Sequence, residues 1–140
     1  MCFHKKKQEL ASEYIGTLGK IIKIEVSEDW VTKQAVLALD NPVDKARQSG
    51  KPSLVDFGAT GCKPCDMLAP ILDALREKYK DNLNVVFVHV REKPNLASRY
   101  NVQSIPVQIF YDKNGKEIYR HTGFWPQEEL EKKLKEIGVQ

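Results

Sequence analysis

The sequence lacks any long apolar run and contains little cysteine. Of its 140 residues, 41% are hydrophobic, but none of the apolar stretches is long enough to cross a membrane. We therefore expect one soluble domain with enough material for a core. Three cysteines are too few for the disulfide frameworks that hold small secreted domains together. No repeat, low-complexity segment or shift in composition divides the chain.

A strong charge imbalance is also missing. The 22 basic and 19 acidic residues are spread along the chain and leave a net charge of only +3, which gives a nucleic-acid-binding role little support. The run Lys5-Lys6-Lys7 reads as a solvated tail rather than a binding patch.

What the chain does contain is the motif Cys62-Lys63-Pro64-Cys65, directly after the apolar run 54–57 and at the start of a helical pattern over 66–79. Side chains three apart on a helix are neighbours, so the two sulfurs can bond to each other. The unpaired N–H groups and positive dipole of a helix N-terminus favour a thiolate at Cys62. Lys63 adds a nearby positive charge, and Pro64 suits a first turn, so both are expected to tune the pKa of Cys62.

Three other interpretations of the cysteine pair compete with a redox role. A purely structural disulfide gains little from so short a loop. A zinc site needs two further ligands at finger-like spacing, and His89 and His121 stand alone in strand-like runs, while Cys2 and His4 lie far away in a polar N-terminus. Accidental buried cysteines are the third reading. We predict no metal ligand set.

Hydrophobic periodicity predicts alternating helices and strands, with a buried strand pair joined by a helix. The strand over 84–90 is expected to be buried on both faces, because it is almost continuously apolar. Helices are predicted over 8–18, 30–39, 43–48, 66–79, 95–100 and 127–137, and strands over 21–26, 54–57, 84–90, 107–111 and 117–121, with Ser27 as a cap and a hairpin turn at 112–115.

From Leu54 to Val139 the chain resembles the thioredoxin family. The resemblance rests on Leu54-Val55-Asp56-Phe57, the Cys-x-Pro-Cys motif, Pro70 within the following helix, Ser104-Ile105-Pro106, and Gly123 after the last strand. It implies an α/β thioredoxin fold, a central mixed sheet flanked by helices. We expect residues 1–19 to form a helical or mobile N-terminal extension and residues 20–140 to form the thioredoxin-like domain.

The resemblance also implies roles for individual residues. Cys62 would attack a substrate disulfide, and Cys65 would resolve the mixed disulfide. Asp56, an acid in an apolar strand, should have a raised pKa and take the proton of Cys65 through water; the alternative is an acid turned to solvent at a sheet edge. Ile105 and Pro106, with Gly123, would bind an extended substrate segment, with Pro106 in a cis bond rather than an ordinary trans one.

Departures from the family pattern leave the partner open. Gly58 and Gly61 replace tryptophans, so we expect a flatter, more open and less hydrophobic surface around Cys62. Lys63 replaces a glycine, and Phe87 stands where a lysine often lies near the buried acid. Trp125 and Phe124 either restore apolar surface or cap the core.

The expected function is that of an enzyme, a thiol–disulfide oxidoreductase that reduces protein disulfides and needs no cofactor besides the Cys62–Cys65 couple. Its partners would be protein disulfides and a thioredoxin-reductase-like or membrane thiol electron donor, with the protein acting as a monomer. Alternatives are an extracytoplasmic oxidant, isomerase or cytochrome-maturation protein, a redox-silent peptide-binding module, and a soft-metal-binding protein. No signal peptide is visible, so the expected location is the cytoplasm; the alternative is the periplasm, with an export signal absent from this chain.

Overall fold

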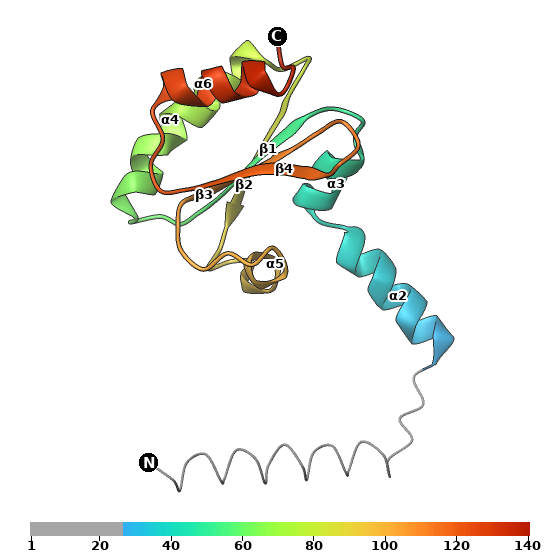
Figure 1. Ribbon diagram of the computed structural model, residues 1–140. Helices are drawn as coiled ribbons and strands as arrows, with labels where there is room; N and C mark the ends of the chain where they lie inside the picture. The colour runs from blue at the N-terminus through green and yellow to red at the C-terminus, as the bar shows by residue number, and fades with distance from the viewer. Residues whose placement is uncertain (1–26) are drawn as a thin grey trace, which may run out of the picture. The chain divides into compact units, whose positions relative to one another are not determined.

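The computed structural model describes residues 27–140, and the unit formed by residues 38–140 contains a four-stranded mixed sheet (Figure 1). The strand order is β2-β1-β3-β4, with β1 and β2 parallel and the other two pairs antiparallel. The elements are α2 (Glu28–Leu39), α3 (Pro42–Gln48), β1 (Ser53–Gly58), α4 (Lys63–Lys78), β2 (Asn84–His89), α5 (Pro94–Arg99), β3 (Val107–Tyr111), β4 (Glu117–Thr122) and α6 (Gln127–Glu136).

Most of the predicted elements are confirmed. Ser27 caps α2, since its hydroxyl accepts a hydrogen bond from the Trp30 N–H, and Asn41-Pro42 separates α2 from α3. The predicted helix over 8–18 and strand over 21–26 lie outside the described residues. The chain divides into compact units at 1–37 and 38–140, and the predicted domain boundary after residue 19 stays a prediction.

The two faces of the sheet carry separate cores, which follow from the alternation of side chains along each strand. On one face, Leu54 and Phe110 pack with the buried leucines of α4 and α6. On the other, Val55, Phe57 and Ile109 pack with α3 and α5. Figure 1 shows α4 and α6 on one side of the strands and α3 and α5 on the other. None of the helices in the described part is both long and apolar enough to span a bilayer.

The prediction that the strand over 84–90 is buried on both faces is wrong for the described structure. Within residues 27–140, β2 pairs only with β1 and forms an edge of the sheet. Val88 is its one fully buried side chain, and Phe87 is 45% exposed. Val85 packs against the core on one face of the sheet and Val86 and Val88 against the core on the other, so both faces are covered only in part and Phe87 stays exposed.

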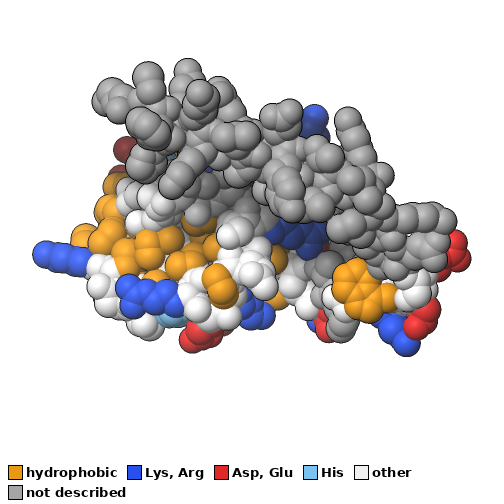
Figure 2. Space-filling model, turned by 90° about the horizontal axis from the view of Figure 1, so that it is seen from below, with side chains coloured by type: hydrophobic (Ala, Val, Ile, Leu, Met, Phe, Trp, Pro, Cys, Tyr) orange, Lys and Arg blue, Asp and Glu red, His pale blue; other side chains and the backbone are white. Residues whose placement is uncertain are grey.

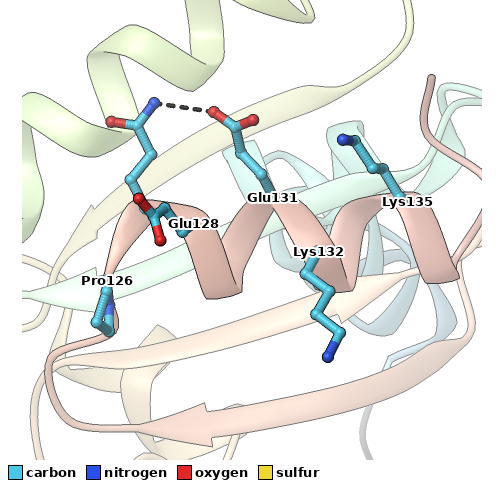
Figure 3. A pocket seen from close by; sticks show the side chains of 6 residues that line it. Pro126, Glu128, Glu131, Lys132 and Lys135 are labelled. Atoms are coloured by element: carbon cyan, nitrogen blue, oxygen red, sulfur yellow. Dashed lines mark hydrogen bonds between the residues drawn. The ribbon is translucent and has the colours of Figure 1, made fainter.

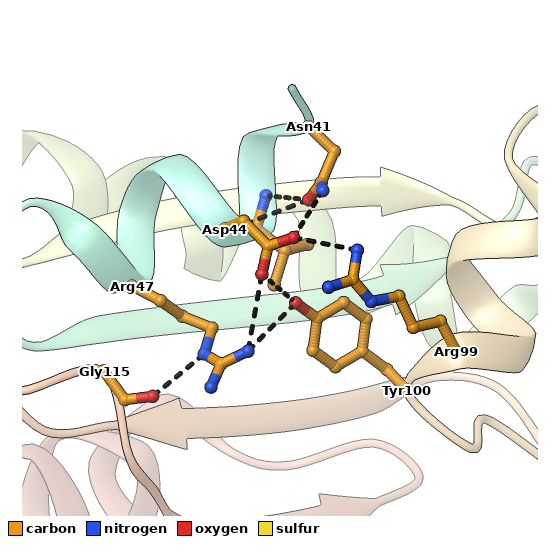
Figure 4. Close-up of polar contacts among 7 residues, drawn as sticks. Asn41, Asp44, Arg47, Arg99, Tyr100 and Gly115 are labelled. Atoms are coloured by element: carbon orange, nitrogen blue, oxygen red, sulfur yellow. Dashed lines mark hydrogen bonds and ion pairs between the residues drawn. The ribbon is translucent and has the colours of Figure 1, made fainter. Parts of the chain in front are cut away.

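A polar network fixes α3 against α5 and the β3–β4 hairpin (Figure 4). Asn41 caps α3 by accepting hydrogen bonds from the Val43 and Asp44 N–H groups. The buried Asp44 carboxylate accepts hydrogen bonds from Tyr100 and pairs with Arg99.

Arg47 extends this network to the hairpin by donating to the carbonyl of Gly115. Gly115 has a φ of +75°, and a Cβ there would lie 2.5 Å from the Arg47 carbonyl oxygen, so only glycine fits this approach.

Candidate active site

The dithiol motif lies where β1 passes into α4. Cys62 is the N-cap of α4, with extended backbone angles, and Cys65 lies one turn further in. The two residues form a disulfide, with their Cα atoms 5.2 Å apart. Cys62 is half-buried, whereas Cys65 is only 6% exposed. Cys65 is therefore the more shielded of the two cysteines.

The start of α4 favours negative charge at Cys62. Pro64 stands in the first turn, where no N–H donor is needed, and the Asp66 N–H donates to the Cys62 carbonyl at 2.9 Å. The exposed Lys63 adds a positive charge at the position next to Cys62 in the chain. A helix N-terminus and a neighbouring cation both stabilise a thiolate relative to a thiol.

Asp56 lies beneath this dithiol on an interior strand. Asp56 is 1% exposed, and this burial raises its pKa to about 6. The hydrogen bond from Gln108 acts in the opposite direction and lowers the pKa. A Cβ built on Gly58 would lie 3.4 Å from Asp56 Oδ2 and 3.5 Å from Cys65 Cβ, so acid and inner cysteine share one small space. The predicted buried acid with a raised pKa is confirmed.

The surface around the dithiol differs from the expectation at one of the two glycines. A Cβ on Gly58 would come within 2.9 Å of Phe87 Cε2, so the Phe87 ring fills the space that a larger residue would need. Gly58 is buried rather than open. Gly61, with a φ of +77° and nothing within 4 Å of its Cβ direction, is open as predicted.

The proline loop lies at the same end of the strands as the dithiol, beside the C-terminal end of β1. The Ile105–Pro106 bond is cis, as predicted. Val107 pairs with Phe57, which places Pro106 beside the end of β1 that leads to Cys62. The Gly123 N–H donates to the Pro106 carbonyl at 2.8 Å, so the predicted site residue Gly123 contacts this loop.

Two contributors to the site were not predicted. Gln108 hydrogen-bonds to Asp56 from the neighbouring strand β3. His89 Nε2, at the end of β2, accepts a hydrogen bond of 3.2 Å from the backbone N–H of Thr60, in the turn before the dithiol. The signal for Gln108 was present in the sequence, since an amide within the apolar run 107–111 is costly to bury without a partner.

Hydrophobic side chains are exposed near these residues. Met67 in α4, Phe87 and Phe124 are all accessible, whereas Trp125 belongs to the core. Figure 2 shows hydrophobic side chains gathered on one part of the face it presents, with Lys and Arg side chains beside them.

Other parts of the described structure carry no comparable chemistry. A hollow along α6 is lined mainly by charged side chains, with Gln127 bonded to Glu131, and none of the site residues lines it (Figure 3). Among residues 27–140 no group of three or more His, Cys, Asp or Glu side chains is placed to hold a metal ion.

Known proteins match this chain over most of its length. The thioredoxin family model matches residues 31–136. The thioredoxin of Alicyclobacillus acidocaldarius is 37% identical over 98 residues, which cover 70% of this chain and 92% of that protein. The thioredoxin of Staphylococcus saprophyticus is 40% identical over 95 residues, which cover 68% of this chain and 89% of that protein. Thioredoxin Y, chloroplastic, of Oryza sativa is 38% identical over 98 residues, which cover 70% of this chain and 56% of that protein. With its cysteine pair in place at the start of α4, the chain belongs to the thioredoxin family and is a thiol–disulfide oxidoreductase.

Proposed function

We propose that this oxidoreductase works as a reductase of protein disulfides. The observation that carries the proposal is the arrangement of a half-exposed Cys62 at a helix N-terminus, a buried Cys65, and a buried Asp56 beside it. The outer sulfur is accessible to a substrate and the inner one is shielded, which suits a nucleophile and a resolving thiol respectively.

The reaction begins from the dithiol. The Cys62 thiolate attacks one sulfur of the substrate disulfide, forms a mixed disulfide and releases the other substrate sulfur as a thiolate. Asp56 then takes the proton of Cys65, whose thiolate attacks Cys62 Sγ. The Cys62–Cys65 bond forms, and the second substrate thiolate leaves. Two electrons have passed to the substrate.

Ile105 and Pro106 would hold the substrate segment during this exchange. Their loop borders the end of β1, and an extended peptide beside it would pair with the backbone of Ile105. Since the Gly123 N–H is bonded to Pro106, Gly123 has only its carbonyl left for such a segment. The exposed Met67, Phe87 and Phe124 supply apolar contact area nearby.

Return to the dithiol requires two electrons and two protons from a donor, for which we propose a thioredoxin-reductase-like enzyme or a membrane thiol protein. We further propose that the protein acts as a monomer, in a reducing compartment such as the cytoplasm. A reducing compartment keeps a couple of low potential in the dithiol form.

The first test is the reduction potential of the couple, measured in dithiothreitol or glutathione buffers with free thiols quantified. A potential of about −270 mV supports the role of a reductase, whereas a potential of about −120 mV indicates an oxidant outside the cytoplasm. The second test is trapping: reduced Cys65→Ser should accumulate a mixed disulfide with a target protein that carries a disulfide, and reduced Cys62→Ser should accumulate none. Equal trapping by both variants contradicts the assigned roles.

A further inference from the structure

A row of side chains crosses the sheet beneath the dithiol. In register, Asp56 of β1 stands opposite Phe87 of β2 and Gln108 of β3, and Gln108 stands opposite His121 of β4. Gln108 is completely buried, and its Nε2 donates a hydrogen bond of 2.9 Å to Asp56 Oδ1. Its Oε1 is buried with no hydrogen-bond partner among the described residues.

Packing alone gives no reason for glutamine at this position. A buried amide costs free energy unless its hydrogen-bonding groups are satisfied, and an apolar side chain of similar volume carries no such cost. Here one end of the amide is unpaired, and the other end is bonded to Asp56. The pairing with the acid is therefore the feature that distinguishes Gln108 from leucine or methionine.

Among residues 27–140, the remaining surroundings of Asp56 supply no cation that shifts its pKa. On β2 its neighbour is Phe87, which is uncharged, and the titratable group facing it from α4 is Cys65. His121 lies one strand beyond Gln108, stacked on Trp125 with ring centroids 4.4 Å apart, and its Nε2 is also buried and unpaired. Burial and the Gln108 hydrogen bond are the two influences that set the pKa of Asp56 within the described residues.

An amide differs from a cation in what it can bind. Its N–H₂ donates to a carboxylate, and its oxygen accepts from the O–H of a neutral carboxyl. A half-turn about the broad terminal torsion of glutamine exchanges these two ends. His121, which stands opposite Gln108 in the register of β3 and β4, has ring nitrogens that include a donor and an acceptor in the neutral form.

We propose that Gln108 is a positioning residue of the exchange reaction, whose amide holds the Asp56 carboxyl in place both before and after it takes the proton of Cys65. Before the transfer, Gln108 donates to the carboxylate; afterwards, its oxygen accepts from the carboxyl O–H. The proton passes from Cys65 to Asp56, and the Cys65 electron pair forms the bond to Cys62 Sγ as the bond from Cys62 to the substrate sulfur breaks. The inference rests on the proton-accepting role proposed for Asp56.

The test follows the two thiol-releasing steps of the reduced protein with a chromogenic aromatic disulfide, from pH 4.5 to 9. The first release reports attack by Cys62, and the second reports resolution by Cys65. In Gln108→Met, the midpoint of the pH dependence of the second-step rate should rise by roughly one pH unit. At pH values below that midpoint the second step should be about tenfold slower, and the rate of the first step should not change. Tyr111→Phe, which removes an unpaired buried hydroxyl from the same strand, is the matched control and should leave both steps unchanged.

Asp56→Asn separates this inference from the proposed function. If Asp56→Asn abolishes the pH dependence of the second step while Gln108→Met keeps the original midpoint, the role of Gln108 is wrong and that of Asp56 stands. If Asp56→Asn leaves the second step unchanged, the proposed role of Asp56 fails, and the inference fails with it.

A measurement on the unaltered protein guards against a variant that does not fold. The side-chain amide resonances of Gln108 should titrate with the same midpoint as the Asp56 carboxyl carbon, because the amide changes partner as the acid is protonated. Amide resonances that stay constant through that midpoint would overturn the proposal.

Discussion

The hydroxyl of Tyr100 donates a hydrogen bond of 2.7 Å to the carboxylate of Asp44, which is only 3% exposed. Burial by itself would raise the pKa of Asp44, but hydrogen bonds from Tyr100 and Asn41 and the charges of Arg99 and Arg47 hold it below its usual range. This contact joins α3 to the end of α5, two elements far apart in the sequence, on the face of the sheet away from the dithiol (Figure 4).

Removing this hydroxyl should destabilise the fold. A hydrogen bond to a buried charged group contributes about 1.5–3 kcal/mol, so we expect Tyr100→Phe to lower the free energy of unfolding by that amount at neutral pH. Since the folded pKa of Asp44 is lowered, its stabilisation is present above the unfolded pKa and is lost as the pH falls through the folded value. The deficit should therefore shrink in acid.

Guanidinium unfolding at pH 7 and pH 3 measures both effects. Tyr111→Phe is again the control, because the Tyr111 hydroxyl is buried with no hydrogen-bond partner in the described part of the chain and its loss should change stability little. Equal effects of the two substitutions would show that the contact with Asp44 contributes nothing.

Ionisation of Asp56 should affect the free energy of unfolding in the direction opposite to that of Asp44. Its pKa is about 6 in the folded protein, against about 3.9 in an unfolded chain, so the folded state binds more protons between these values. Stability from this group falls as the pH rises through that window. The free energy of unfolding of Asp56→Asn should therefore exceed that of the unaltered protein by about 2–3 kcal/mol at pH 8. This difference should vanish near pH 4. Chemical unfolding of the oxidised protein across this range tests the expectation, with the exposed Asp81→Asn as control; a pH-independent difference contradicts it.

The sequence was sufficient to predict the elements that depend on local signals. The cysteine pair stands at a helix start, the proline break at Asn41-Pro42 separates two helices, and the acid in an apolar strand is buried with a raised pKa. Each of these follows from residue type, spacing and the apolar flanks, which a single sequence displays directly.

Pairing between strands was harder to predict, because register and edge position depend on the whole sheet. The apolar run of β2 looks the same whether the strand is covered fully or only in part, so the exposure of Phe87 was not predicted. The Phe87 ring beside Gly58 and the Gln108 amide beside Asp56 both come from neighbouring strands, and nothing in the local sequence gives their register. The Asp44 network likewise joins elements that are distant in the chain.

A cation in place of Phe87 should lower the pKa of Asp56. Phe87 stands opposite Asp56 in register, so a lysine there would place its charge near the carboxylate and favour the ionised form. We expect Phe87→Lys to lower the midpoint of the Asp56 carboxyl titration by roughly one unit or more, as followed by carbon NMR. Ile118→Lys adds the same charge at another exposed hydrophobic position, on β4, and should leave the midpoint nearly unchanged. Matching shifts in both variants would mean that net charge, rather than proximity, is responsible.

The turn before the dithiol should loosen when His89 is replaced. His89 Nε2 accepts a hydrogen bond of 3.2 Å from the Thr60 N–H and lies 3.3 Å from the Thr60 hydroxyl oxygen. Leucine cannot accept, so in His89→Leu the Thr60 amide should exchange its hydrogen about fivefold faster, corresponding to the loss of one hydrogen bond of about 1 kcal/mol. Thr60→Val removes only the hydroxyl and should retain slow exchange at residue 60. Exchange at Thr60 that is unchanged in His89→Leu would show that the turn holds its shape through the chain leading into α4, without the imidazole.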